Sequence, residues 1–186
     1  MNVQKLSRTA AIAALTCLAG MMLRWVSPAL VPFSILPIMV LLAGIVLGAE
    51  YGALAMTVYV TLGLFGLPVF SAAPFGGIAY LAKPTFGFLL GYIGAAYAVG
   101  KIYRPQKIVT AILAVLCGLA VLYGFGLSYL YIIMRWVLHK PTSLALVLTV
   151  GFFPFIISDL IKAIIAAVVG NQVVRSRAKA DDDFYK

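Results

Sequence analysis

The stretch PFIISDLIKAIIAAVVG, residues 154–170, is almost entirely apolar, yet it contains the carboxylate of Asp159 and the ammonium of Lys162. A helix advances by about 100° per residue, which places both charges on one face. Small residues share that face (Ala163, Ala166 and Gly170), and bulky aliphatic residues occupy the opposite one (Ile161, Ile164, Ile165 and Val168). We therefore predict a helix whose small, charged face points inward.

The composition of the whole chain indicates a protein embedded in a lipid bilayer. Of its 186 residues, 64% are hydrophobic and only 10% are charged, whereas soluble domains carry about 25% charged residues. The net charge of +9 comes from loops and chain ends. Because no run of Lys and Arg is interleaved with aromatic residues, we expect no nucleic-acid partner.

The hydrophobic pattern predicts an all-α integral membrane protein. A helix needs roughly 20 apolar residues to cross about 30 Å of hydrocarbon. Six segments meet this condition approximately, at residues 9–26, 35–49, 51–67, 84–100, 108–130 and 154–174. Little more than GAEYG separates the second and third, which predicts a tight helical hairpin, and the connection after residue 134 is long enough for a short helix. We expect one domain over residues 1–186, with 179–186 as a flexible cytoplasmic tail.

The distribution of Lys and Arg predicts the orientation. Short cytoplasmic loops carry an excess of these residues. With six spans, one side of the membrane holds nine of them (Lys5, Arg8, Lys101, Arg104, Lys107, Arg175, Arg177, Lys179 and Lys186) and the other holds four (Arg24, Lys83, Arg135 and Lys140). Both termini are therefore expected in the cytoplasm. The predicted location is the bacterial cytoplasmic membrane, with three long connections facing outward.

Asp159 and Lys162 allow two interpretations. At a spacing of three residues they can pair and simply hold the helices together, in which case removing both is nearly harmless. Alternatively, they line an outward-facing pocket and bind a polar ligand, since ionisable residues inside a membrane are candidate functional sites. Asp159 lies about 24 Å above Arg175, at ~1.5 Å per residue, which places it near the outer surface.

The connection between the third and fourth spans favours the pocket. Gly76 and Gly77 permit close backbone approach to a ligand, and Phe75 and Tyr80 supply flat apolar surface. Lys83, just before the fourth span, could pair with a ligand carboxylate. An apolar pocket with a few convergent polar groups suits a small amphipathic molecule.

Other features of the sequence limit the function. There is no G-x-x-x-x-G-K-[ST] phosphate loop, no metal-ligand cluster and no nucleophile arrangement, so we expect no enzyme, no cofactor and no metal. Small residues recur in the first span (Ala10, Ala13, Ala14, Cys17 and Gly20) and in the fourth (Gly87, Gly91, Gly94 and Ala98). Such faces allow close helix packing in lipid. A binding subunit that depends on a partner fits this pattern.

Three segments together resemble the BioY family, the biotin-specific substrate-binding (S) components of energy-coupling factor (ECF) transporters. They are GLFGLPVF (63–70), FGGIAYLAKPTFGFLLGY (75–92) and FFPFIISDLIKAIIAA (152–167). The resemblance implies six spans and an outward pocket for biotin. It also implies partners, a transmembrane coupling protein and two ATP-binding-cassette ATPases that hydrolyse ATP. A small face on the first helix, matched here by Ala10 and Ala14, would dock on the coupling protein.

The resemblance also implies site residues. Asp159 and Lys162 match the polar pair of the family, and residues 76–80 match its loop over the ligand. The ureido ring of biotin suits an acceptor beside a donor, so Asp159 would accept its N–H groups and Lys162 would donate to its oxygen. The apolar walls are expected from Phe33, Phe75 and Tyr80. For the biotin carboxylate we expect Lys83 or, second, Arg135.

Two alternatives remain open. The chain could be a stand-alone porter that uses Asp159 as a proton or ion site, or an S component for another small carboxylated vitamin.

Overall fold

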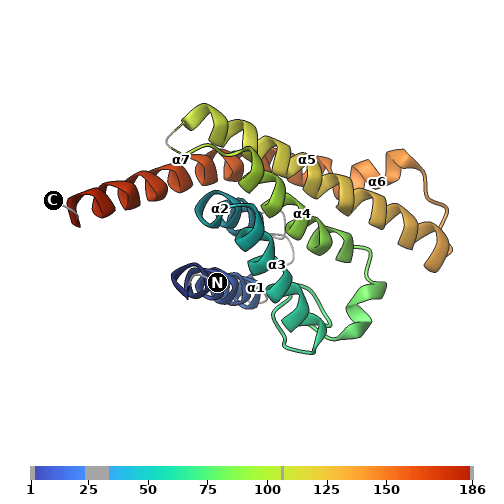
Figure 1. Ribbon diagram of the computed structural model, residues 1–186. Helices are drawn as coiled ribbons and strands as arrows, with labels where there is room; N and C mark the ends of the chain where they lie inside the picture. Colours follow the sequence, from blue (N-terminus) through green and yellow to red (C-terminus); the bar gives the residue numbers. More distant parts are fainter. Residues whose placement is uncertain (1–2, 24–33, 106, 185–186) are drawn as a thin grey trace.

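The computed structural model describes residues 3–23, 34–105 and 107–184, with side chains up to 180, and this part of the chain contains helices and no strand. Figure 1 shows their arrangement. In chain order they are α1 (Val3–Met22), α2 (Leu36–Leu47), α3 (Ala49–Leu64), the 3-10 helix η3 (Ile78–Ala82), α4 (Phe86–Ile102), α5 (Ile108–Ile132), the π-helical turn η4 (Ile133–Val137), α6 (Leu144–Gly151) and α7 (Phe153–Phe184).

The most extensive helix pair is α4 with α5. It forms because glycines let the two backbones approach closely. A Cβ atom on Gly91 would lie 2.8 Å from the carbonyl oxygen of Leu122, and one on Gly87 would clash with Tyr129. The small face predicted for the fourth span therefore packs within the chain.

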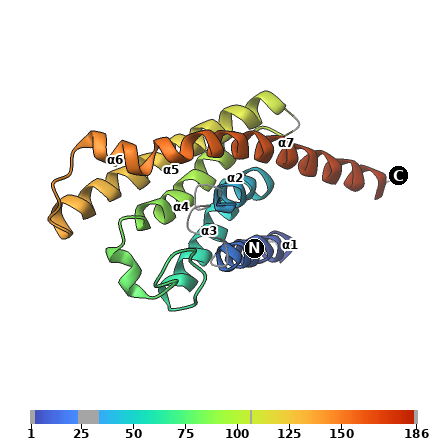
Figure 2. The same cartoon turned by 180° about the vertical axis from the view of Figure 1, so that it is seen from behind.

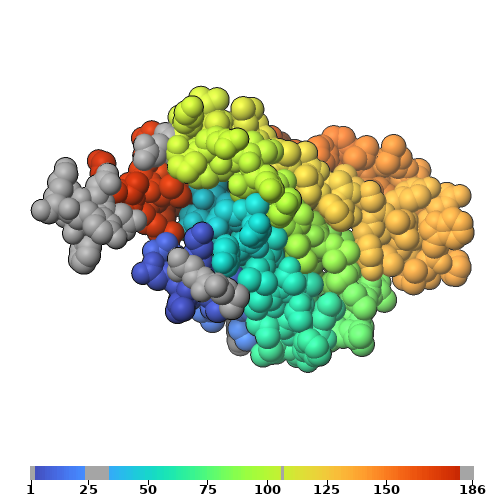
Figure 3. Space-filling view, in the orientation of Figure 1, coloured from blue at the N-terminus to red at the C-terminus, as the bar shows by residue number. Residues whose placement is uncertain are grey.

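α2 occupies the centre of the bundle. It contacts α1, α3, α4 and α7, and its residues Val40, Leu41 and Ala43 are completely buried. α1 packs mainly on α3 and lies at the edge of the molecule (Figures 1 and 3). α7 crosses α2 and α5 and extends past the bundle to the C-terminus (Figure 2).

Several turns meet at one end of the bundle. Only Gly48 separates α2 from α3, with a φ of 81° that favours glycine, as expected for the predicted hairpin. Close contact joins this turn to Gly100 of α4, and the Lys5 ammonium of α1 lies 5.6 Å from the ring centroid of Tyr51. The α2–α3 turn, the C-terminal end of α4 and the start of α1 thus lie at a common end.

A buried hydrogen bond fixes α7 at the same end. The Tyr103 hydroxyl donates to Asn171 Oδ1 at 2.9 Å, which joins the C-terminus of α4 to α7. Asn171 is 3% exposed, and burying its side-chain amide without a partner would be costly.

Most predicted segments match the helices, with differences at their ends. The short helix expected before the last segment is α6. The segment predicted at 108–130 continues through η4 to Val137, and that at 154–174 continues to Phe184. The helix-forming residues Ala178, Lys179 and Ala180 extend α7, and the flexibility expected for residues 179–186 stays a prediction.

The small residues predicted on one face of the first segment all lie in α1 and differ in burial. Ala13 and Gly20 are buried, whereas Ala10 and Ala14 are exposed. The five small residues cover a broad arc of the helix, and the packing of α1 on α2 and α3 buries only part of it. Ala10 and Ala14 consequently lie on a side of α1 that the described residues leave uncovered.

The surface and length of the helices suit a membrane. Two of the described helices, Ile108–Val137 and Phe153–Ala180, are long and apolar enough to cross one. Large aliphatic side chains on α7 are at least 40% exposed, among them Ile157, Ile161, Ile164, Ile165 and Val168.

Candidate functional site

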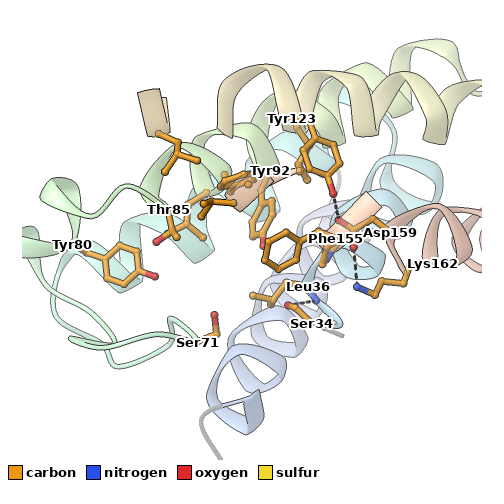
Figure 4. Close-up of a pocket in the computed structure, with 17 residues that line it drawn as sticks. Ser34, Leu36, Ser71, Tyr80, Thr85, Tyr92, Tyr123, Phe155, Asp159 and Lys162 are labelled. Carbon is orange, nitrogen blue, oxygen red and sulfur yellow. Dashed lines mark hydrogen bonds and ion pairs between the residues drawn. The ribbon is translucent and has the colours of Figure 1, made fainter. Parts of the chain in front are cut away.

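A cavity of about 280 Å³ lies between α2, α4, α5, α6 and α7, close to the lower end of the usual range for small-molecule pockets, ~300–1,000 Å³. Its lining includes residues far apart in the sequence, from Ser34 to Lys162. Figure 4 shows them around one space. Most of the lining is apolar, contributed by residues such as Leu89, Leu122 and Phe155.

Three polar side chains form a buried cluster on one side of this cavity, here called the charged cluster: Asp159, Lys162 and Tyr123. The Lys162 ammonium lies 2.8 Å from Asp159 Oδ1, and the Tyr123 hydroxyl donates to Asp159 Oδ2 at 2.7 Å. Asp159 is 5% exposed and Lys162 is 8% exposed. Each oxygen of the carboxylate thus has one donor and retains lone pairs that can accept another.

The local sequence of α7 explains this placement. Asp159, Lys162, Ala163 and Ala166 are buried on the inner face, while Ile161 and Ile164 are exposed on the outer one. The small alanines allow α7 to approach α2 and α5. The inward direction predicted for the two charges agrees with the structure.

Aromatic rings surround the charged cluster. The Tyr123 ring packs edge-on against Phe88 and Phe152, with centroid distances of 6.1 and 5.1 Å. Tyr92 of α4 is buried and also lines the cavity. Such edge-to-face packing holds each ring in one orientation, so the hydroxyl of Tyr123 is directed at the carboxylate.

The connection after α3 is tied to the bundle at several points. Phe70 is completely buried, and its ring lies 4.4 Å from that of Tyr80. The Gly77 amide donates to the Gly63 carbonyl at 2.7 Å. Ser71 and Tyr80 from this region line the cavity, so part of the cavity wall is formed by this loop.

Of the residues predicted to bind ligand, Asp159, Lys162 and Tyr80 line the cavity. The others do not line it within the described part of the chain. Gly76 packs against the Leu67 carbonyl, Gly77 has an open environment at a φ of 89°, and Phe75 has a φ of 65°. The predicted Phe33 lies outside the described residues.

The two cations predicted for a ligand carboxylate are also outside the lining. Lys83 is exposed at the end of η3, three residues before α4. Arg135 is exposed in η4, where it donates to the Tyr131 hydroxyl at 3.3 Å and lies over its ring. The extension of α5 by η4 carries Arg135 past the cavity.

Sequence reasoning missed several lining residues, above all Tyr92, Tyr123, Ser71 and Thr85. A signal was available for two of them, because Tyr92 and Tyr123 each lie within a glycine-rich apolar segment. A buried hydroxyl usually requires a partner, which indicates a polar group nearby. For metal binding, the residues with assigned positions contain no group of three His, Cys, Asp or Glu side chains.

Comparison with known proteins shows what the chain resembles. The sequence model of the BioY family matches residues 1–179. The chain belongs to the BioY family. A probable biotin transporter BioY of Lysinibacillus sphaericus is 36% identical over 150 residues, which cover 78% of this chain and 75% of that protein. The biotin transporter BioY of Thermotoga maritima is 36% identical over 148 residues, covering 78% and 83%.

A crystal structure of the S-component for biotin from an ECF-type ABC transporter has the same fold as this BioY-family chain. The TM-score is 0.73 at 24% identity, and the match covers 92% of this chain and 90% of the other. The helical bundle described above is therefore an S-component fold.

Proposed function

We propose that this chain is the biotin-binding S component of an ECF vitamin transporter. The observation that carries the proposal is the charged cluster in the cavity of a chain that belongs to the BioY family. Relatives with about a third of their residues identical are named biotin transporters. The subunit uses no cofactor of its own.

In this proposal the charged cluster binds the ureido group of biotin. Asp159 accepts from ureido N–H groups, and Lys162 donates to the ureido oxygen. Tyr123 holds the carboxylate of Asp159 in position. Apolar side chains of the lining, including Leu89 and Phe155, contact the sulfur ring and the aliphatic chain.

The proposed membrane topology has six spanning helices (α1 to α5 and α7) and both termini in the cytoplasm. It is supported by the common end where Lys5, the α2–α3 turn and Tyr103 meet, because the basic residues Lys101, Arg104 and Lys107 belong to that end. The cavity loops lie toward the opposite end (Figure 1) and would face outward.

The proposed partners are the transmembrane coupling protein and two ATP-binding-cassette ATPases, which would supply the energy. Ala10 and Ala14 are exposed on α1, four residues apart on a helix at the edge of the bundle. Small residues at this spacing permit close approach by a partner helix in the membrane.

Equilibrium binding of radiolabelled biotin to the purified protein tests the proposal. We expect saturable binding by the wild type and a large loss in Asp159→Ala. A wild-type protein that binds biotin no better than this variant would refute the vitamin assignment. Biotin-independent proton uptake that requires Asp159 would instead support the stand-alone porter, and preferential binding of another carboxylated vitamin would change the substrate.

A further inference from the structure

The cavity has two polar sides with different chemistry. On one side lies the charged cluster. On the other lie three neutral hydroxyls, here called the hydroxyl cluster: Ser71 of the loop after α3, Tyr80 of η3 and Thr85 just before α4. Figure 4 shows the two clusters on opposite sides, with Tyr92 between them.

The hydroxyl cluster is anchored in the fold by Tyr80, whereas Ser71 is half-buried and Thr85 is exposed. Tyr80 is 3% exposed, and its ring is held between Phe70 at 4.4 Å and Phe86 at 6.4 Å. Burial raises the pKa of the Tyr80 phenol, and a side-chain hydrogen bond with Thr85 opposes this shift. Tyr80 therefore remains a protonated donor at neutral pH. Thr85 makes no side-chain capping bond to α4.

Positive charge is confined to the other side of the cavity. Among the described lining residues only Lys162 is cationic, and it is paired with Asp159 at 2.8 Å. A ligand carboxylate placed there would meet the Asp159 carboxylate, which is unfavourable for two like charges in a site of low dielectric constant. Lys83 and Arg135 are exposed and do not line the cavity.

We infer that the hydroxyl cluster binds the ligand carboxylate through hydroxyl donors, without a cation from the described residues. This inference rests on the proposed function, because it takes the ligand to be an amphipathic acid whose ureido group occupies the charged cluster. Hydroxyl groups donate well to carboxylates. The first turn of α4, whose N–H groups carry partial positive charge, adds to the favourable potential next to Thr85.

This arrangement makes a specific prediction about recognition. Hydrogen bonds to an ionised acceptor are roughly twice as strong as those to a neutral one. Removing the hydroxyls should therefore weaken binding of the carboxylate form more than that of its neutral amide. Removing the charge of an exposed cation, Lys83 or Arg135, should change the affinity for neither the carboxylate form nor the amide.

The experiment compares biotin with biotinamide as probes, using the purified full-length protein and equilibrium binding. The test variants are Ser71→Ala combined with Thr85→Val, and separately Tyr80→Phe, which retains the packed ring. The matched controls are Lys83→Met and Arg135→Met. We expect both test variants to lose about tenfold or more in biotin affinity, to lose clearly less in biotinamide affinity, and both controls to bind like the wild type.

Binding of biotinamide also reports whether each variant is folded. Equal losses for the two probes in both test variants would overturn the inference, because they would show a structural effect only. A selective loss of biotin binding in Lys83→Met or Arg135→Met would also overturn it, by assigning the carboxylate to that cation. A wild type that binds neither probe would instead refute the proposed function, and with it the inference.

Discussion

Neutralising the Asp159–Lys162 pair in two ways should separate its contribution to stability from its contribution to binding. In the structure, the Asp159 carboxylate has two side-chain donors, the Lys162 ammonium and the Tyr123 hydroxyl. In Lys162→Met this carboxylate stays buried and keeps the Tyr123 hydroxyl, but it loses the opposite charge. In the double variant Asp159→Asn with Lys162→Met, no charge remains at this position. The two variants therefore differ in whether an uncompensated charge is buried.

The magnitudes follow from burial. Asp159 is 5% exposed and Lys162 is 8% exposed, and removing one partner of such a pair costs about 3–5 kcal/mol, whereas replacing both is often nearly neutral. Because both side chains line the cavity, water can reach them, and we expect the cost of removing one partner to lie at the lower end of that range. For ligand binding, each hydrogen bond to a charged group contributes about 1.5–3 kcal/mol. Losing one corresponds to roughly 10- to 150-fold in affinity.

The assay combines thermal unfolding in detergent with biotin binding. We expect Lys162→Met to unfold at a clearly lower temperature than the wild type and the double variant to recover most of that loss. Both variants should bind biotin poorly. A double variant that binds biotin like the wild type would refute the role of the pair in recognition. Equal stability of Lys162→Met and the wild type would refute the argument from burial.

Three further experiments with substituted protein test other contacts. Tyr123→Phe removes the hydroxyl that holds the buried carboxylate of Asp159. We expect the fold to be retained and equilibrium binding to show about a tenfold or larger loss of biotin affinity. Unchanged affinity would exclude a positioning role for Tyr123. Ala10→Trp combined with Ala14→Trp should abolish biotin uptake by cells that express the complete transporter while purified protein still binds biotin, and loss of binding would show that this face is only structural. Gly91→Ala should destabilise the protein by about 1–3 kcal/mol, because its Cβ would lie 2.8 Å from a backbone oxygen of α5. The control Gly124→Ala, whose Cβ would have no atom within 4 Å, should not be destabilised in thermal unfolding. Equal effects of the two substitutions would contradict this account of helix packing.

The helices and the inward direction of the charged pair could be predicted because both depend on local periodicity. Asp159 and Lys162 are on the same face of α7 as Ala163 and Ala166, and any helix formed by this segment must keep that arrangement. The hairpin at Gly48 was equally local.

The partners across the cavity could not be predicted in the same way. Tyr123 meets Asp159 only because α5 crosses α7, and Ser71 reaches the cavity only because Phe70 is anchored in the core. Lys83 and Arg135 lie outside the cavity lining for a related reason. The sequence places a cation near a helix end, but the direction of its side chain depends on the tertiary structure.

The two tyrosine contacts of α7 limit how the helices around the cavity can separate. Tyr123 binds Asp159, and Tyr103 binds Asn171, twelve residues further along the helix, or about 18 Å. Both tyrosines belong to the closely packed α4–α5 unit and its end. Swinging α7 outward would break two buried hydrogen bonds at once, so entry through a gap between these helices is unfavourable.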